Sequence, residues 1–212
     1  GRNAAGQSYN ESFIKSYGTF IHDQEITPPI DNGKPVFSGV SDTRIKQGTA
    51  FDPDRWAQIA ENGFTLLMLP ESAGGLGLAE LDFALIAQAA GYVALPEPLV
   101  ESAGIAAPML AALAPDHAVL ADPSAIIAIA PAVNPVVASA DVASAILLEK
   151  DGHAFLAMPD KVTLTSAATI DPLRRVFRVD WNPADAEDLG PADWTLATDR
   201  AAVFAAAQGL GL

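Results

Sequence analysis

The chain has 212 residues, half of them apolar, which is enough to bury the core of one or two domains. Acidic side chains outnumber basic ones by 26 to 12, and the resulting formal net charge of −14 argues against binding to nucleic acid or to an anionic membrane. With no cysteine, no membrane-length apolar run and no signal-peptide pattern, we expect a soluble, cytoplasmic protein without disulfides or thiolate metal sites.

Residues 1–48 are an atypical N-terminal segment. Residues 27–35 contain three prolines, an asparagine and a glycine, which predicts turn and extended chain. His22 lies near Asp23 and Glu25, a combination that would suit a metal or an acid-base cluster. A lone histidine in a polar segment is more often solvated, so no metal site is predicted here.

Residues 51–63 are predicted to form a short amphipathic helix. Asp52 suits the N-cap, Pro53 the first turn and Gly63 the C-terminal cap. The apolar side chains that share one face of this helix are Trp56, Ile59 and Ala60.

The stretch Pro70-Glu71-Ser-Ala-Gly74-Gly75-Leu-Gly77 separates this helix from the next. Pro70 blocks continuation of the preceding segment, and the three glycines permit positive φ or close approach of another backbone. The lysine and the Ser or Thr of a phosphate-binding P-loop are missing, so we predict a structural interhelical loop.

A second helix follows at residues 79–90, with Leu81 and Leu85 at helical spacing, and ends at Gly91. Next comes the proline-rich stretch Leu95-Pro-Glu-Pro-Leu. The order of these motifs resembles the N-terminal helical domain of the acyl-CoA dehydrogenases. The order is a helix with Trp and Gly, then Pro-Glu-x-x-Gly-Gly-x-Gly, a helix with Asp near its start, Gly-Tyr and Leu-Pro-Glu-Pro-Leu. The resemblance is strongest from Trp56 to about Leu113.

Residues 99–113 read as an alanine-rich helix in which Glu101 is surrounded by apolar side chains. Its carboxylate suits either the wall of a ligand pocket or, more commonly, a solvated helix surface. Strands are then predicted at 125–130, 145–149, 153–158, 162–165 and 175–181, with Asp151-Gly152 as a hairpin turn. His153, beside that turn, is predicted to be an exposed strand residue and not a catalytic base.

The β segment follows the order of the same family, and Ile170-Asp-Pro-Leu-Arg-Arg-Val176 resembles its Asp-Pro-x-Arg-Arg stretch. Members that hold flavin usually carry Thr-Glu-Pro and Gly-Ser-Asp after the first strand of this domain. The equivalent stretch here is Ile129-Ala-Pro-Ala-Val-Asn-Pro135. FAD binding by this chain alone is therefore doubtful, and FAD is expected only in a complete assembly.

Residues 193–208 are predicted to form a helix that resembles the first helix of the family's C-terminal domain. Its apolar face should pack on its own domains or on another subunit. The expected fold is α+β: an atypical segment (1–48), a helical domain (49–120), a reduced antiparallel β domain (121–190) and the first helix of a truncated C-terminal domain (191–212).

In the family, a glutamate removes a proton from Cα of an acyl-CoA thioester and the flavin accepts a hydride from Cβ. The resemblance implies that the glutamate lies in the missing helices, so no catalytic residue is assigned here. The chain is expected to be an incomplete or flavin-poor subunit, in a homo-oligomer or in a heteromer with a flavin-binding partner. The alternative is a non-catalytic interaction module that retained the fold.

Arg174 and Arg178 are the predicted substrate-binding residues. No lysine or arginine occurs between Arg55 and Lys150, and on a strand Arg174 and Arg178 would share one face while Phe177 points to the other. They could therefore meet the phosphates of CoA. The alternative is pairing with acidic neighbours such as Asp171, Asp180 or Asp185.

Overall fold

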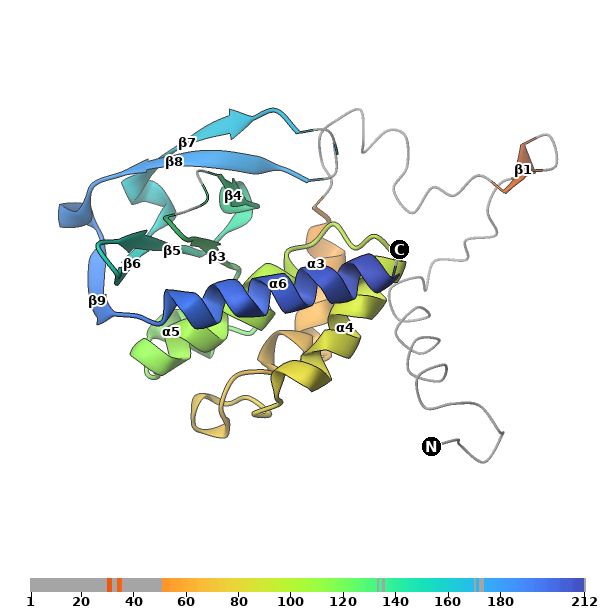
Figure 1. Cartoon of the computed structure of the whole chain (residues 1–212), viewed down its shortest axis with the longest axis horizontal. Coiled ribbons are helices and arrows are strands. Elements are labelled where there is room, and N and C mark those ends of the chain that lie inside the picture. The colour runs from red at the N-terminus through yellow and green to blue at the C-terminus, as the bar shows by residue number, and fades with distance from the viewer. Residues whose placement is uncertain are drawn as a thin grey trace.

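The structure is a computed structural model that describes residues 30–31, 34–35, 51–132, 134, 136–169, 171 and 174–211. Strands β1 (Ile30–Asp31) and β2 (Lys34–Pro35) form a small antiparallel pair, in agreement with the extended chain predicted there. The His22 cluster lies outside the described residues. From residue 51 onward the chain forms helices packed beside two small sheets, which confirms the α+β class (Figure 1).

Helices form the lower part of the molecule in Figure 1, and the long C-terminal helix crosses its front. None of the helices in the described ranges combines the length and apolar composition needed to span a lipid bilayer. The helices are α3 (Pro53–Glu61), α4 (Glu80–Tyr92), the π-helical segment η3 (Val100–Ala106), α5 (Ala107–Leu113) and α6 (Trp194–Gly211), with short 3-10 turns at Phe64–Leu66, Glu71–Ala73 and Ala118–Ala121.

Helix α3 begins as predicted. The carboxylate of Asp52 accepts hydrogen bonds from the amides of Asp54 and Arg55, at 3.0 and 3.3 Å. Trp56 is buried, and its indole N–H donates to the carbonyl of Ser124, 2.7 Å away. This bond fastens α3 to the chain that leads into the β domain.

The glycine loop has the predicted geometry. Gly74 and Gly77 have positive φ, at 80° and 61°. Gly75 has a different role, because a Cβ there would overlap the backbone of Leu69. The loop is therefore fixed by backbone conformation at two glycines and by close packing at the third.

Helix α4 buries a different face from the one predicted by the helical spacing of Leu81 and Leu85. Phe83 is fully buried, whereas Leu81 and Leu85 are 82% and 45% exposed. Phe83 packs against Phe204 of α6, with ring centroids 5.0 Å apart. Gly104 makes room for both rings, since a Cβ there would lie 2.6 Å from Phe83 and 2.9 Å from Phe204.

Helix α6 packs on its own chain, one of the two outcomes expected for it, but the predicted apolar face is covered only in part, at Phe204 and Ala207. Its buried residues are Trp194, Ala197, Phe204 and Ala207. Leu196 and Val203, on the other side, stay 42% and 47% exposed. In Figure 1 α6 runs beside α4, and Arg200 reaches Glu80 with a 2.7 Å contact between Nη2 and Oε1.

The β domain has two sheets, and one strand pair corrects the prediction of an antiparallel domain. β3 and β5 run parallel, because the chain between them turns aside through β4 and returns to the same end. All other pairs in both sheets are antiparallel. The first sheet has the order β3-β5-β6-β9 and the second β4-β8-β7; the strands are β3 (Ile127–Ala130), β4 (Val137–Ala138), β5 (Ala145–Lys150), β6 (His153–Ala157), β7 (Val162–Ala167), β8 (Val176–Trp181) and β9 (Glu187–Pro191).

The hairpin between β5 and β6 is confirmed. Asp151 and Gly152 both have positive φ, at 52° and 78°, as a two-residue turn of this kind requires. β8 shows the predicted alternation, with Phe177 buried and Arg178 exposed. It begins at Val176, so Arg174 and Arg175 precede the strand.

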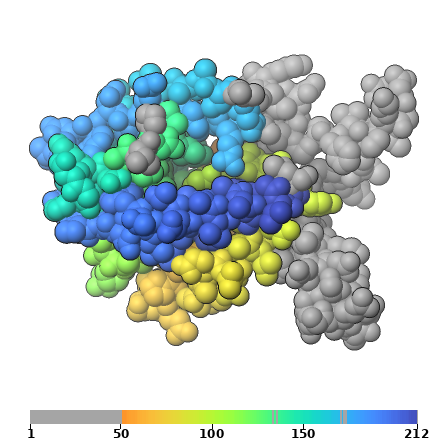
Figure 2. Space-filling view, in the orientation of Figure 1, coloured from red at the N-terminus to blue at the C-terminus, as the bar shows by residue number. Residues whose placement is uncertain are grey.

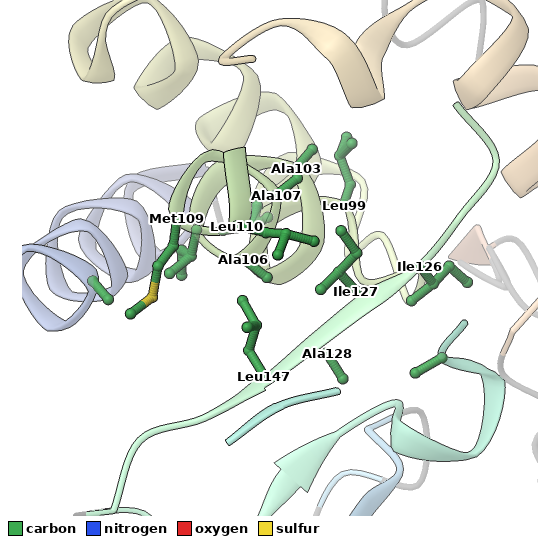
Figure 3. Packing of buried hydrophobic residues seen from close by; sticks show 14 of the residues in the cluster. Leu99, Ala103, Ala106, Ala107, Met109, Leu110, Ile126, Ile127, Ala128 and Leu147 are labelled. Atoms are coloured by element: carbon green, nitrogen blue, oxygen red, sulfur yellow. The ribbon is translucent and has the colours of Figure 1, made fainter. Parts of the chain in front are cut away.

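The core is continuous between helices and sheet. Figure 3 shows Leu99, Ala103 and Leu110 on the helical side facing Ile127 and Leu147 on the strands. The buried hydroxyl of Ser102 accepts a hydrogen bond from the amide of Ile127, 2.9 Å away. This contact anchors the first residue of β3 on the helical layer.

Candidate functional site

A cleft of about 420 Å³ lies between η3, α6 and the strands β3, β4 and β8. Figure 2 shows the surface hollowed between α6 and the β domain. Its volume is in the range of small-molecule sites. The apolar lining residues are Ile105, Ile129, Pro131, Val136, Ala138, Val176, Ala197 and Ala201, and the polar ones are Glu101, Asn134, Arg174 and Thr198.

The η3 segment places Glu101 and Ile105 on the wall of this cleft. A π-helical segment within a helix is rare and often occurs at functional sites. Small residues on α6 form the opposite side, where Ala197 and Ala201 leave room that larger side chains would fill. The sequence left two positions open for the carboxylate of Glu101, and the structure places it at the wall of a pocket, which was the less common of the two.

Arg174 lies at the cleft, as a substrate-binding residue would. Its Nη1 is 2.9 Å from Oε1 of Glu101, on a helix 73 positions earlier. The acidic partner is therefore Glu101, which the predicted set of neighbours did not include. Thr169 supports this turn, because its hydroxyl donates to the carbonyls of Asp171 and Arg174 at 2.7 and 3.1 Å.

Arg178 lies elsewhere. It is exposed in the middle of β8, opposite Thr165 of β7, and is not among the residues that line the cleft. Arg175 directly follows Arg174 in the chain. Its guanidinium pairs with Asp141 and lies 5.6 Å from the centre of the Phe177 ring. A role for Arg178 in substrate binding stays a prediction.

The loop residues Pro70, Glu71, Gly74, Gly75 and Gly77 form the interhelical loop, and none lines the cleft. Their predicted role is structural, and the backbone geometry of the glycines supports it. No group of three His, Asp or Glu side chains within the described ranges is arranged to bind a metal.

The histidines that the structure describes make pairs on β9. His153 is half-exposed and its Nδ1 lies 3.0 Å from Asp188, while Nε2 of His117 lies 3.5 Å from Glu187. Hydrogen bonds from the amide of Gly190 and from His153 lower the pKa of Asp188. Both histidines lie outside the cleft lining.

Three amides of the loop that follows β3 have hydrogen-bond acceptors within the chain. The N–H of Ala132 donates to Glu149 at 2.7 Å, that of Asn134 to the carbonyl of Pro131 at 2.9 Å, and that of Val136 to Oδ1 of Asn134 at 3.2 Å. These amides are therefore engaged, that of Ala132 by a side chain on β5 and those of Asn134 and Val136 within the loop.

The side chains of the cleft are engaged in the same way. The hydroxyl of Thr198 donates to the carbonyl of Trp194, 2.8 Å away, and Glu101 and Arg174 bind each other. A flavin ring needs hydrogen-bond partners along its polar edge. Among the described residues of this cleft, the Glu101–Arg174 pair and Thr198 are already engaged, so few hydrogen-bond partners remain for a flavin ring.

Comparison with known proteins agrees with this architecture. Residues 39–117 match a family model described as "Acyl-CoA dehydrogenase, N-terminal domain". No curated protein matches the chain in a sequence comparison.

Solved structures give fold-level matches over nearly the whole chain. The butyryl-CoA dehydrogenase from Megasphaera elsdenii has a TM-score of 0.67 at 13% identity, with 95% of this chain and 65% of that chain covered. The ChsE4-ChsE5 complex from Mycobacterium tuberculosis has a TM-score of 0.64 at 19% identity, covering 97% and 64%. A Tcur3481-Tcur3483 steroid ACAD has a TM-score of 0.66 at 18% identity, covering 95% and 63%.

At these identities the matches show a common fold, and the chain spans less than two thirds of the length of each of these three proteins. The family model and the fold agree on the same assignment. Residues 39–117 thus correspond to the N-terminal domain of the acyl-CoA dehydrogenases, and nearly the whole chain has the fold of these proteins.

Proposed function

We propose that this chain is a flavin-poor subunit, or a part, of an acyl-CoA dehydrogenase that acts on an acyl-CoA thioester. The observation that carries the proposal is the cleft between η3, α6 and the β domain, whose walls are apolar and whose mouth carries Arg174. The apolar walls suit an acyl group, and the guanidinium suits an anionic group of CoA.

The complete enzyme would need groups that this cleft does not supply. Glu101 is the one carboxylate among the cleft residues that the structure describes, and it is paired with Arg174. The loop amides and Thr198 are engaged internally. A flavin, when bound in the assembly, would supply the hydride acceptor, and this chain's residues would form the wall that holds the acyl group.

Exposed apolar side chains on α4 and α6 support a partner subunit. Leu81, Leu196, Val203 and Leu210 are between 42% and 82% exposed, and residues 201–211 of α6 carry no charged side chain. Apolar surface of this kind marks protein interfaces. We propose that an oligomer or a heteromer with a flavin-binding subunit covers it.

An absorbance scan and a binding titration test the proposal together. The purified chain should lack a stoichiometric flavin band, and dodecanoyl-CoA should bind in calorimetry, more weakly after Arg174→Gln. Lys161→Gln is the matched control, because it also removes one positive charge, from an exposed position outside the cleft. A stoichiometric flavin band would show that the chain binds the cofactor alone. No binding of dodecanoyl-CoA, either by the chain or by its complete assembly, would favour the non-catalytic interaction module.

A further inference from the structure

The ion pair between Glu101 and Arg174 joins the two parts of the molecule at the mouth of the cleft. Glu101 belongs to the helical layer, and Arg174 precedes β8. Nη1 of Arg174 lies 2.9 Å from Oε1 of Glu101. The arginine side chain is half-exposed, and the glutamate side chain is less exposed. The ion pair is therefore a polar bridge between the helices and the β domain at the edge of an apolar hollow.

This pair is also a common wall between two hollows. On one side lies the apolar cleft of about 420 Å³. On the other lies a polar recess of about 20 Å³, which holds about one water molecule. The two hollows share Glu101, Ala138 and Arg174, so the ion pair lines both of them.

Arg174 and Arg175 both line the recess, and their side chains have different partners. Arg175 is held by Asp141 and by the ring of Phe177, and its carbonyl accepts the amide of Ser139 at 2.9 Å. Ser139 has a φ of 56°, which is unusual for a residue other than glycine and fixes this corner of the recess. For the side chain of Arg174, Glu101 is the one ionic partner among the described residues. Arg174 is thus the cation whose partner can be exchanged.

Exposed ion pairs contribute little to stability, so an incoming anion can replace one carboxylate at low cost. Glu101 is tethered beside Arg174, and tethering gives it an effective concentration in the millimolar range or above. A free anion at lower concentration therefore competes poorly. A ligand whose apolar part fills the cleft gains additional free energy and can displace Glu101.

We propose that Glu101 is an internal competitor for Arg174 and thereby sets the affinity of the site for anionic ligands. In the ligand-free chain it neutralises Arg174. An amphipathic ligand with a negatively charged group displaces it, seats that group against Arg174 at the recess and places its apolar part in the cleft. The inference rests on the proposed function for the nature of this ligand, but the exchange at Arg174 can be measured without it.

Replacing Glu101 by glutamine should remove the competitor. The variant Glu101→Gln should bind dodecanoyl-CoA about twofold to fivefold more tightly than the wild type, with a larger gain at low salt. Binding of 1-dodecanol, which has no charge, should not change. Arg174→Gln should weaken binding of dodecanoyl-CoA, and the double variant should match Arg174→Gln, because Glu101 acts only through Arg174.

The control is Glu71→Gln, which removes one negative charge from an exposed position on the interhelical loop. An equal gain in both single variants would reduce the effect to net charge and overturn the proposal. Unchanged or weaker binding of dodecanoyl-CoA by Glu101→Gln would also overturn it.

Inorganic pyrophosphate separates this inference from the proposed function. Its binding can be followed by the NMR signal of the Arg174 side chain, and Glu101→Gln should lower the concentration needed to shift that signal by the same factor of about two to five. If no acyl-CoA binds but pyrophosphate shows this difference, the proposed function fails and the competitor role stands. If acyl-CoA binds and pyrophosphate shows no difference, the competitor role fails alone.

Discussion

Gly91 of α4 lies against the main-chain carbonyl of Gln208 of α6 so closely that a Cβ on Gly91 would overlap the carbonyl oxygen. Gly211 makes the reciprocal contact, with the carbonyl of Gln88. Glycine inside a helix costs about 1 kcal/mol relative to alanine, so its presence at both positions is explained by contact between the two backbones. The C-terminal helix is therefore seated on α4 by main-chain packing.

The variant Gly91→Ala should lower the free energy of unfolding by about 1–2 kcal/mol. Overpacking against a backbone costs about 1–3 kcal/mol, which exceeds the gain in helix propensity. Gly209→Ala is the matched control on α6, because a Cβ there meets no atom within 4 Å. The control should stabilise the chain by about 0.5–1 kcal/mol. Urea unfolding of both variants measures this, and equal effects would contradict the backbone contact.

The buried carboxylate of Glu97 predicts a specific pH dependence. Its side chain is fully buried, accepts the amide of Asp52 at 3.0 Å and lies 3.6 Å from Nη1 of Arg55. Burial raises the pKa of Glu97, and this effect outweighs the opposing effect of Arg55. A raised pKa means that the folded state binds the proton more tightly than the unfolded state does.

Stability should consequently rise as the pH falls from the raised pKa of folded Glu97 to the ordinary glutamate value of about 4.3. Glu97→Gln, which keeps the shape and loses the proton equilibrium, should lack this part of the dependence. The measurement is the difference in unfolding free energy between wild type and variant at several pH values. The wild type should gain relative to the variant towards pH 4.3, and a constant difference would refute the assignment.

The pair between Glu80 and Arg200 should contribute modestly to the seating of α6. Nε and Nη2 of Arg200 donate to the same oxygen of Glu80, at 3.0 and 2.7 Å, and this hydrogen bonding lowers the pKa of Glu80. Because Glu80 is 44% exposed, the coupling energy in a double-mutant cycle should be about 0.5 kcal/mol. This coupling energy should be present at neutral pH and lost as the pH falls through the lowered pKa of Glu80. A double-mutant cycle that shows no coupling at pH 7 would contradict the prediction.

Valine substitutions in the interhelical loop should each destabilise the chain, for different reasons. Gly74→Val and Gly77→Val place a β-branched residue at positive φ, at a cost of about 1–3 kcal/mol. Gly75→Val forces a side chain into the backbone of Leu69. Asparagine tolerates positive φ, so Gly74→Asn should melt closer to the wild type while Gly75→Asn should not. Unchanged melting of all three valine variants would remove the loop from its structural role.

Local chemistry explains what the sequence predicted well. Asp52, Pro53 and the Asp151-Gly152 turn act within a few residues of chain, and each appears in the structure where it was expected. The parallel pairing of β3 with β5 depends on how the intervening chain returns, which no local pattern specifies. The π-helical segment differs from an α-helix by one residue in its hydrogen-bond spacing, and composition does not encode that difference.

The site was harder to predict for the same reason. Arg174 was identified because cations are scarce in this part of the chain, but its partner Glu101 lies 73 positions away on a helix. The prediction grouped Arg174 with Arg178 on one face of a strand. That strand does not include Arg174, since β8 begins at Val176. Spacing along one strand could not show that the turn before it reaches across to the helical layer.

The order of the chain has a consequence for synthesis on the ribosome. Phe204 fills the space beside Phe83 and Gly104, yet it is translated 100 positions after Gly104, with the whole β domain in between. At roughly 5–20 residues per second this interval lasts about 5–20 s. During that time the nascent helical segment presents an open apolar notch. The β domain must fold, or at least emerge, before the final helix can close the notch, which makes the growing chain a natural client for chaperones that shield exposed apolar surface.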